Sequence, residues 1–314
     1  MENKQLSDKT IKTYTTLFNN FMKKLNKEYE YLINKSEEVI EFIKNNYDNI
    51  GSQKTIISAI IYFLKQDNNI ENELKKKIIE NYRLVISNNI KLINEINEKN
   101  GKNEKEDDNW MEWDEIKEIY NNIYTKYKLF LQKPNKLDID TFYNIQNLVL
   151  LAFYVLLEPR RSEYVDIKIQ NYDIENDNYY DEKNNLIILN NYKTSENKEP
   201  FIIKLNLNKE LKKILKDFIK LRKINGFKSD YLFVSNTDTK IDNSQLSKRL
   251  NKIIGKNISV SMLRKIYLSQ TYGDKLNTLK NIKKTSENMG NSIDIIIKNY
   301  IKKWINKILI ILYI

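Results

Sequence analysis

The stretch IQNLVLLAFYVLLEPRRSEYVDIKI, Ile145 to Ile169, contains the change of pattern on which the fold prediction depends. Its first half, Ile145 to Leu157, is strongly apolar and predicts a buried helix. Its end, Val165 to Ile169, is a short run rich in β-branched residues and predicts a strand. A helix followed so closely by a strand indicates a domain that mixes both kinds of element.

Two further strand patterns follow, separated by polar turns. They are NLIILN, Asn185 to Asn190, and PFIIKLN, Pro200 to Asn206. With the first strand they predict a small three-stranded antiparallel sheet. Helical periodicity then resumes in four segments, near Leu211–Leu221, Ser244–Ile254, Val260–Thr271 and Lys275–Met289. The fold class that we expect is α+β, mainly α.

The N-terminal part of the chain has only helical patterns. Apolar residues recur at helical spacing from Tyr14 to Leu25, with Ser7 as the expected N-cap. Further helices are expected over Glu37–Asn45, after Gly51-Ser52, and around Leu74–Glu98. The polar segment GKNEKEDDN, residues 101–109, is interpreted as an interdomain linker. We therefore expect a helical domain over residues 1–100, this linker, and a mixed domain over residues 110–314.

Composition excludes several kinds of chemistry. The 314 residues include no cysteine and no histidine, which excludes disulfides, thiolate zinc sites, imidazole bases and His-ligated metals. The carboxylates form no convincing metal cluster, and we expect neither a metal nor a cofactor. Lys and Arg outnumber Asp and Glu by 53 to 42, a net charge of +11, which favours a polyanionic partner such as nucleic acid. An AT-rich genome would also enrich the chain in Lys, Asn and Ile, so composition alone leaves both interpretations open.

Arginine is rare in this chain, and two arginines lie in unusual surroundings. Only six of the 53 basic residues are arginines. Arg160 follows the apolar helix, and Arg264 lies in the partly apolar segment SVSMLRKIYLS. A guanidinium fork matches a phosphate in a way that lysine does not, so both are candidate phosphate ligands. A buried pair of Arg160 with Glu163 is the structural alternative, and Arg161 fits a surface role better than a contact with DNA.

Four short motifs resemble, in order, those of the tyrosine recombinases (phage-integrase family). Arg160-Arg161-Ser162-Glu163 resembles the first motif, G-x-R-x-S-E, and Ser261-Met262-Leu263-Arg264-Lys265 resembles the second, H-x-L-R-H. Between them, the strand–turn–strand around Tyr192-Lys193-Thr194 resembles the hairpin that carries the family's catalytic lysine. Met289-Gly290-Asn291-Ser292 resembles the third motif, L-G-H-S, and Tyr300 follows Gly290 by ten residues, the family's usual spacing. The family also joins a helical core-binding (SAM-like) domain to its catalytic domain, so the resemblance covers nearly the whole chain.

The resemblance implies a metal-independent DNA strand transferase. Tyr300 would be the nucleophile that forms a 3′-phosphotyrosine link. Arg160 and Arg264 would neutralise the non-bridging oxygens of the same phosphate as charge builds on them. Lys193 would protonate the departing sugar oxygen, with Lys198 on the same hairpin as the alternative.

The resemblance also implies partners and a location. Double-stranded DNA would be bound by a homotetramer, with the basic, tyrosine-rich helices of the N-terminal half contacting phosphates. The apolar tail ILIILYI, Ile308 to Ile314, fits a core helix of its own domain, or a segment that docks on a neighbouring protomer as is common in the family. The N-terminus MENKQLSDKT is not a signal peptide, and no run of about 18 apolar residues suggests a membrane span. We therefore expect an intracellular protein.

Three positions differ from the family pattern. Ser261 stands where the second motif has a histidine, and Lys265 is a tolerated variant at its last position. Asn291 stands where the third motif has His or Trp. Serine is a poor base, although Ser261 and Asn291 can both form hydrogen bonds to a phosphate. Losing one such contact costs about 10²–10³ in rate, about 3 kcal/mol, so we expect a slow site.

Other functions remain open at this point. Type IB topoisomerases share this catalytic fold and commonly have a lysine at the position of Ser261, but the N-terminal helical module favours a recombinase. A degenerate integrase that only binds DNA is a third interpretation, because the family histidines are absent. A helical scaffold without a role on nucleic acid is a fourth.

Overall fold

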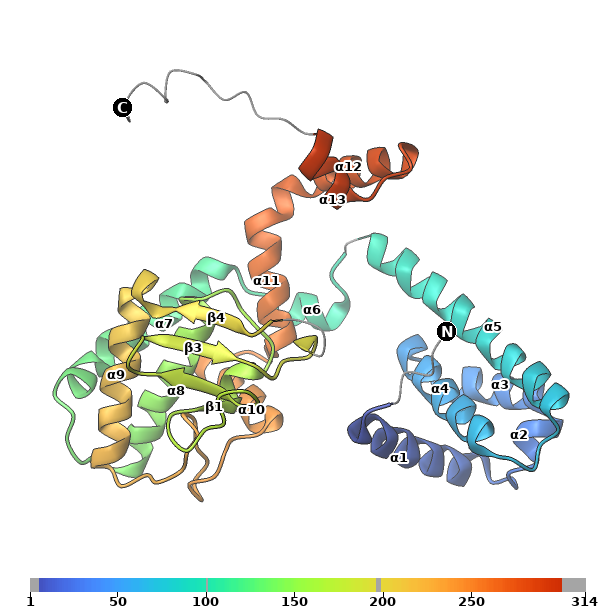
Figure 1. The fold of residues 1–314 in the computed structure, drawn as a ribbon, viewed down its shortest axis with the longest axis horizontal. Helices are drawn as coiled ribbons and strands as arrows, with labels where there is room; N and C mark the ends of the chain where they lie inside the picture. Colours follow the sequence, from blue (N-terminus) through green and yellow to red (C-terminus); the bar gives the residue numbers. More distant parts are fainter. Residues whose placement is uncertain (1–5, 100, 196–198, 301–314) are drawn as a thin grey trace. The chain divides into compact units, whose positions relative to one another are not determined.

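The structure is a computed structural model that describes residues 6–99, 101–195 and 199–300 (Figure 1). The chain divides into two compact units, Met1–Lys102 and Asn103–Ile314. The boundary falls within the segment interpreted as a linker. The second part of that segment forms helix α6 (Glu104–Asn109), capped by reciprocal hydrogen bonds between Asn103 and Glu106. The polar composition that suggests a linker also supplies this capping box.

Helices make up the described part of the first unit. They are α1 (Asp8–Leu25), α2 (Tyr31–Asn34), α3 (Ser36–Asn46), α4 (Ile50–Gln66) and α5 (Asn72–Glu98). The four helices that the periodicity predicts are present, and Ser7 caps α1 by accepting a hydrogen bond from Thr10 N (3.3 Å). Helix α4 packs against both α1 and α5 and buries Ile57, Ala59 and Ile60 completely. This unit therefore has a core of its own, formed around α4.

Helix α8 (Ile139–Val155) is the centre of the second unit. Every residue from Leu148 to Tyr154 is fully buried, as expected for a helix that is apolar on all sides. Helices α7 (Trp113–Gln132), α9 (Lys209–Ile224) and α10 (Asn243–Ile254) pack against it. Figure 1 shows this group of helices beside the strands of the sheet.

The sheet has four strands in the described residues, not the predicted three, and it is mixed rather than antiparallel. In spatial order the strands are β1 (Ile167–Lys168), β2 (Asn178–Asp181), β3 (Leu186–Leu189) and β4 (Phe201–Lys204). Strand β1 is parallel to β2, and the other two pairs are antiparallel. The three predicted strands are present but shorter, because 3-10 helices η1 (Glu163–Asp166) and η3 (Leu205–Leu207) adjoin the first and the last. The mainly helical α+β class is confirmed.

Strand β2 is the element that the hydropathy pattern does not predict. Its sequence NYYD lies among Asn, Asp and Glu residues and has no apolar alternation. Two of its side chains, Asn178 and Tyr180, are nevertheless buried. The Asn178 amide donates to Asn191 O (2.8 Å) and accepts from Asn191 N (2.8 Å). A buried side chain that pairs with backbone in this way satisfies the polar groups at the end of β2 without any apolar residue.

A second buried amide ties α8 to a loop, and its loss is expected to destabilise the protein. Gln146 is fully buried; its Nε2 donates to Val234 O (2.9 Å) and its Oε1 accepts from Val234 N (2.9 Å). Gln146→Leu leaves that N–H unpaired in the core, so we expect a loss of about 2 kcal/mol in the free energy of unfolding. Chemical denaturation measures it. The control is Gln170→Leu, which removes an exposed bond to Lys228 O, and equal losses for both variants would contradict this role of burial.

The C-terminal part of the described chain is helical, as predicted. It contains α11 (Val260–Tyr272), the 3-10 turn η4 (Gly273–Lys275), α12 (Leu276–Asn288), the short α13 (Ile293–Ile295) and the π-helical turn η5 (Ile296–Tyr300). The apolar tail Ile308–Ile314 lies outside the described residues. Among the helices that are described, none has both the length and the apolar character needed to cross a bilayer.

Candidate active site

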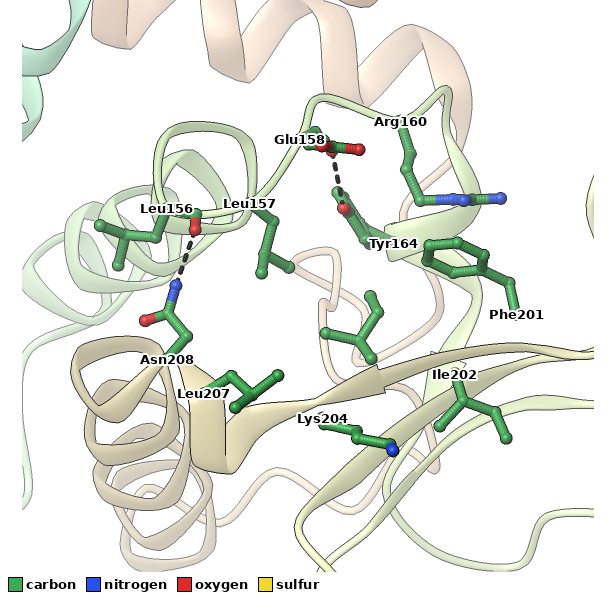
Figure 2. A pocket seen from close by; sticks show the side chains of 11 residues that line it. Leu156, Leu157, Glu158, Arg160, Tyr164, Phe201, Ile202, Lys204, Leu207 and Asn208 are labelled. Carbon is green, nitrogen blue, oxygen red and sulfur yellow. Dashed lines mark hydrogen bonds between the residues drawn. The ribbon is translucent and has the colours of Figure 1, made fainter. Parts of the chain in front are cut away.

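The turn that carries Arg160 is held by two buried tyrosines. The hydroxyl of Tyr154 donates to Arg161 O (2.7 Å), and that of Tyr164 donates to Glu158 O (3.2 Å); the second bond is drawn in Figure 2. Burial raises the pKa of Tyr164, and the nearby charge of Arg160 opposes this rise. The backbone on both sides of Arg160 is therefore fixed by the core beneath it.

The guanidinium of Arg160 lies on two aromatic rings and has no partner of opposite charge among the described residues. Its central carbon is 4.1 Å from the ring centroid of Phe201 and 5.3 Å from that of Tyr192. Its Nε is buried without a hydrogen-bond partner, and no described residue forms an ion pair with the group. The alternative pair with Glu163 is not formed. The Glu163 side chain is buried, and its Oε2 has no hydrogen-bond partner among the described residues. An arginine held by its face keeps the donors at its edge available for an anion.

An open, mostly apolar cavity of about 380 Å³ lies beside Arg160. Figure 2 shows Arg160 and Phe201 at one end of it and Leu207 and Asn208 at the other. The Asn208 amide closes that other end by donating to Leu156 O (2.7 Å). Arg160, the candidate residue for binding an anion, therefore lies at one end of a mostly apolar cavity.

Lys193 lies in the connection between β3 and β4, close to Arg160 in the fold. It follows Tyr192, the residue whose ring contacts the guanidinium. A tight turn holds this segment, because Ser195 N donates to Tyr192 O (2.9 Å) and the Tyr192 hydroxyl donates to Glu199 O (3.0 Å). The Lys193 side chain is exposed. The alternative lysine, Lys198, lies outside the described residues.

Arg264 and Ser261 lie on α11, near its N-terminus. Ser259 caps the helix by accepting a hydrogen bond from Met262 N (3.2 Å), and the burial of Leu263 fixes the helix on the core. Arg264 is half-buried and makes no hydrogen bond or ion pair with any described residue, while Ser261, one turn earlier, is exposed. Like Arg160, Arg264 is a cation on a rigid element, without an anionic partner in the part of the chain that the structure describes.

Arg264 lies beside the turn that carries Arg160. A second cavity, of about 210 Å³, is lined by Glu158, Pro159, Arg264, Tyr267, Leu268 and Tyr272. Glu158 also lines the first cavity, beside Arg160. The structure therefore brings Arg160, Arg264 and the Lys193 connection to one region of the second unit. This region is the candidate active site.

Two tyrosines on α11 belong to this region and were not predicted as site residues. The ring of Tyr267 packs edge-on against Trp113, with ring centroids 5.3 Å apart, and burial followed by the charge of Glu158 raises its pKa. Tyr272, two turns beyond Arg264, is 46% exposed and lines the same cavity. Helical spacing from Arg264 is the only signal in the sequence that could have identified Tyr272.

The third motif has a structural role in addition to any chemical one. Gly290 has a φ of 67°, its N donates to Glu287 O (3.0 Å), and Asn291 N donates to Ser286 O (2.9 Å). This is the Schellman end of α12. The Asn291 side chain is bonded within the same turn, to Met289 O (3.0 Å). The next residue, Ser292, caps α13, so the motif stops one helix and starts another.

Gly290→Ala is expected to weaken the end of α12. No atom lies within 4 Å of the added methyl group, so the cost is the left-handed backbone alone, about 1 kcal/mol. Hydrogen exchange of the last α12 amides should become faster. Gly273→Ala is the control, because its backbone is right-handed helical and its surroundings are equally open. Equal exchange in both variants would show that the backbone strain at Gly290 has no effect.

Tyr300 is not brought into contact with the other candidate residues. It ends η5, its side chain is 58% exposed, and it makes no hydrogen bond or ring contact with another described residue. The neighbouring Ile296 is buried and anchors the turn. Of the predicted residues, Arg160, Arg264 and Lys193 therefore gather in one region with Ser261 on the same helix as Arg264, whereas Asn291 and Tyr300 lie on a separate segment.

Within the described residues, no group of three or more acidic side chains is arranged to hold a metal ion. Comparisons of the chain with models of protein families, with curated proteins and with solved structures found no match.

Proposed function

We propose that the chain is a tyrosine-type DNA strand transferase, a site-specific recombinase or integrase that needs no metal. The main support for the proposal is the environment of the Arg160 side chain. Its guanidinium is stacked on Tyr192 and Phe201 and has no carboxylate partner among the described residues. These two rings flank the connection that holds Lys193, and the turn of Arg160 adjoins the cavity that Arg264 lines. The proposal is that these three cations, which come from separate elements, bind one phosphate of the DNA.

The proposed reaction exchanges one phosphodiester for another. The Tyr300 hydroxyl attacks the phosphorus, the bond from phosphorus to the 5′-oxygen breaks, and a 3′-phosphotyrosine forms. Lys193 gives a proton to the departing 5′-oxygen. The tyrosine proton passes to solvent, because Ser261 is too weak a base to hold it. Attack by the 5′-hydroxyl of a second strand reverses the step and joins new partners, so bond energy is conserved.

The proposal requires the segment that ends at Tyr300 to approach the arginines when DNA is bound. Tyr300 is exposed and makes no hydrogen bond or ring contact with another described residue, which is compatible with such an approach. Two duplexes exchanging strands need four active sites, so the partner that we propose besides double-stranded DNA is a homotetramer on that DNA. The net charge of +11 supplies the sequence-independent part of the binding.

A nicked suicide duplex tests the proposal. The probe is a pool of end-labelled duplexes with random sequence around a nick, in which the short fragment bearing the 5′-hydroxyl diffuses away after cleavage. The expected result is a labelled protein band that survives denaturation and forms in the presence of EDTA. Absence of this band while the protein still binds DNA would support the degenerate, DNA-binding interpretation. Relaxation of a supercoiled plasmid that lacks any selected site would support the topoisomerase instead.

A further inference from the structure

The acidic helix α6 is docked on the N-terminal part of α11. Glu106 forms an ion pair with Lys265, the residue next to Arg264. The side chain of Glu106 is 17% exposed and that of Lys265 is 58% exposed. The other oxygen of Glu106 accepts a hydrogen bond from Asn103 N (3.2 Å). The carboxylate is therefore held in place by its own helix cap while it contacts the lysine.

Two more contacts fasten this segment to the loop before α11. Asn257 N donates to Asn109 Oδ1 (3.0 Å), and Lys256 Nζ donates to Trp110 O (2.8 Å). Contacts from the middle and from the C-terminal end of α6 thus hold it against the helix and the loop. Its position is set by the second unit alone, because α6 and α11 both belong to that unit.

The charges of the two helices are complementary. Four of the six residues of α6 are acidic: Glu104, Glu106, Asp107 and Asp108. Helix α11 has no acidic residue, and its first two turns carry Arg264 and Lys265. The hydrogen bond with Lys265 lowers the pKa of Glu106, which keeps it a carboxylate at neutral pH. A fixed anion thus lies against Lys265, next in sequence to Arg264, the residue that binds a phosphate of the DNA in the proposed function.

We propose that Glu106 is an internal competitor for DNA, which occupies Lys265 in the free protein and must be displaced by a phosphate of the bound duplex. This inference rests on the proposed function, because that function brings DNA to α11. It adds an acidic segment at the start of the second unit that lowers DNA affinity until a duplex engages this unit. Non-specific binding is weakened most, since it depends on charge alone.

The competing explanation is that the ion pair only fastens α6 to α11. The two explanations predict different changes in DNA affinity when the ion pair is removed. Loss of a competitor strengthens DNA binding, whereas loss of a structural bond leaves it unchanged or weakens it. Glu106→Gln separates them well, because glutamine keeps the volume and the hydrogen bond of the capping box and removes only the charge.

The experiment measures the affinity of the full chain for a short random-sequence duplex at low salt. Glu106→Gln is expected to bind about two- to fivefold more tightly than Glu104→Gln, the size of effect that one surface ion pair supplies. Glu104→Gln is the matched control, since it removes the same charge from the same helix at an exposed side chain. In a Lys265→Gln background the gain from Glu106→Gln should disappear. Equal affinities of the two glutamine variants, or a gain that persists without Lys265, would overturn the inference.

The test of Glu106 and the test of the proposed function can fail independently of each other. If the wild type forms the covalent adduct and the two glutamine variants bind DNA equally, only the competitor role of Glu106 fails. If Glu106→Gln binds more tightly but no adduct forms on any duplex, the competitor role stands and the chemistry fails. A protein that binds no duplex at low salt overturns both.

Discussion

Tyr300→Phe is expected to abolish the covalent DNA adduct, with a loss on the order of 10³-fold or more, because no other group would replace its attacking oxygen. DNA affinity should stay within about twofold, since the ring is kept and the Tyr300 hydroxyl has no partner among the described residues. The measurement is the amount of labelled suicide duplex that remains attached to protein in a denaturing gel. A parallel binding assay shows that the variant still engages DNA.

The controls for this variant are Tyr267→Phe and Tyr272→Phe. Both tyrosines line the cavity of Arg264, and both lie nearer to it in sequence than Tyr300 does. Each control should form the adduct at close to the wild-type rate. An adduct that persists in Tyr300→Phe and is lost in Tyr272→Phe would show that the nucleophile is Tyr272 on α11 and not Tyr300.

Arg160→Lys is the second variant with a large expected effect. Lysine keeps the charge but loses the planar fork, which stacks on Phe201 and which, in the proposed function, would bind two phosphate oxygens. We expect adduct formation to fall by about 10²–10³-fold. Binding to DNA should weaken far less, because the net charge of the protein is unchanged. Single-turnover cleavage of the suicide duplex measures the first quantity and a gel shift measures the second.

Arg161→Lys is the matched control for Arg160→Lys. The two residues are adjacent, carry the same charge and differ in surroundings, since the Arg161 side chain is exposed whereas Arg160 contacts two rings. Arg161→Lys should leave the cleavage rate nearly unchanged. A similar fall for both would mean that Arg160 is not a special phosphate ligand. Thermal unfolding of both variants shows whether a loss at Arg160 comes from the fold instead.

Much of the fold can be predicted from periodicity, because its elements bury continuous apolar faces. Helix α8 is the clearest case, since a helix without a polar face has to be central. Strand β2 could not be predicted, because its buried Asn178 is a polar residue that is satisfied by the backbone of Asn191, beyond the neighbouring strand β3. The parallel pairing of β1 with β2 could not be predicted either, because it involves a strand that the hydropathy pattern does not reveal. Polar side chains paired across the fold leave no trace in hydropathy.

The candidate site could be predicted in part. The rarity of arginine identifies Arg160 and Arg264, and the structure leaves both without an anionic partner among the described residues. The sequence could not decide between a phosphate and Glu163 as the partner of Arg160, because that choice depends on where the Glu163 side chain points. It also could not reveal that Lys265 is occupied by Glu106, since the two residues are far apart in the chain.

The central claim is that one tyrosine becomes joined to DNA through a phosphate, and the most direct measurement identifies that tyrosine. The adduct formed on the suicide duplex is digested with a protease and a nuclease, and the modified peptide is sequenced by mass spectrometry. We expect a nucleotide remnant on the peptide that contains Tyr300. A remnant on Tyr272, or on any residue other than Tyr300, would contradict it.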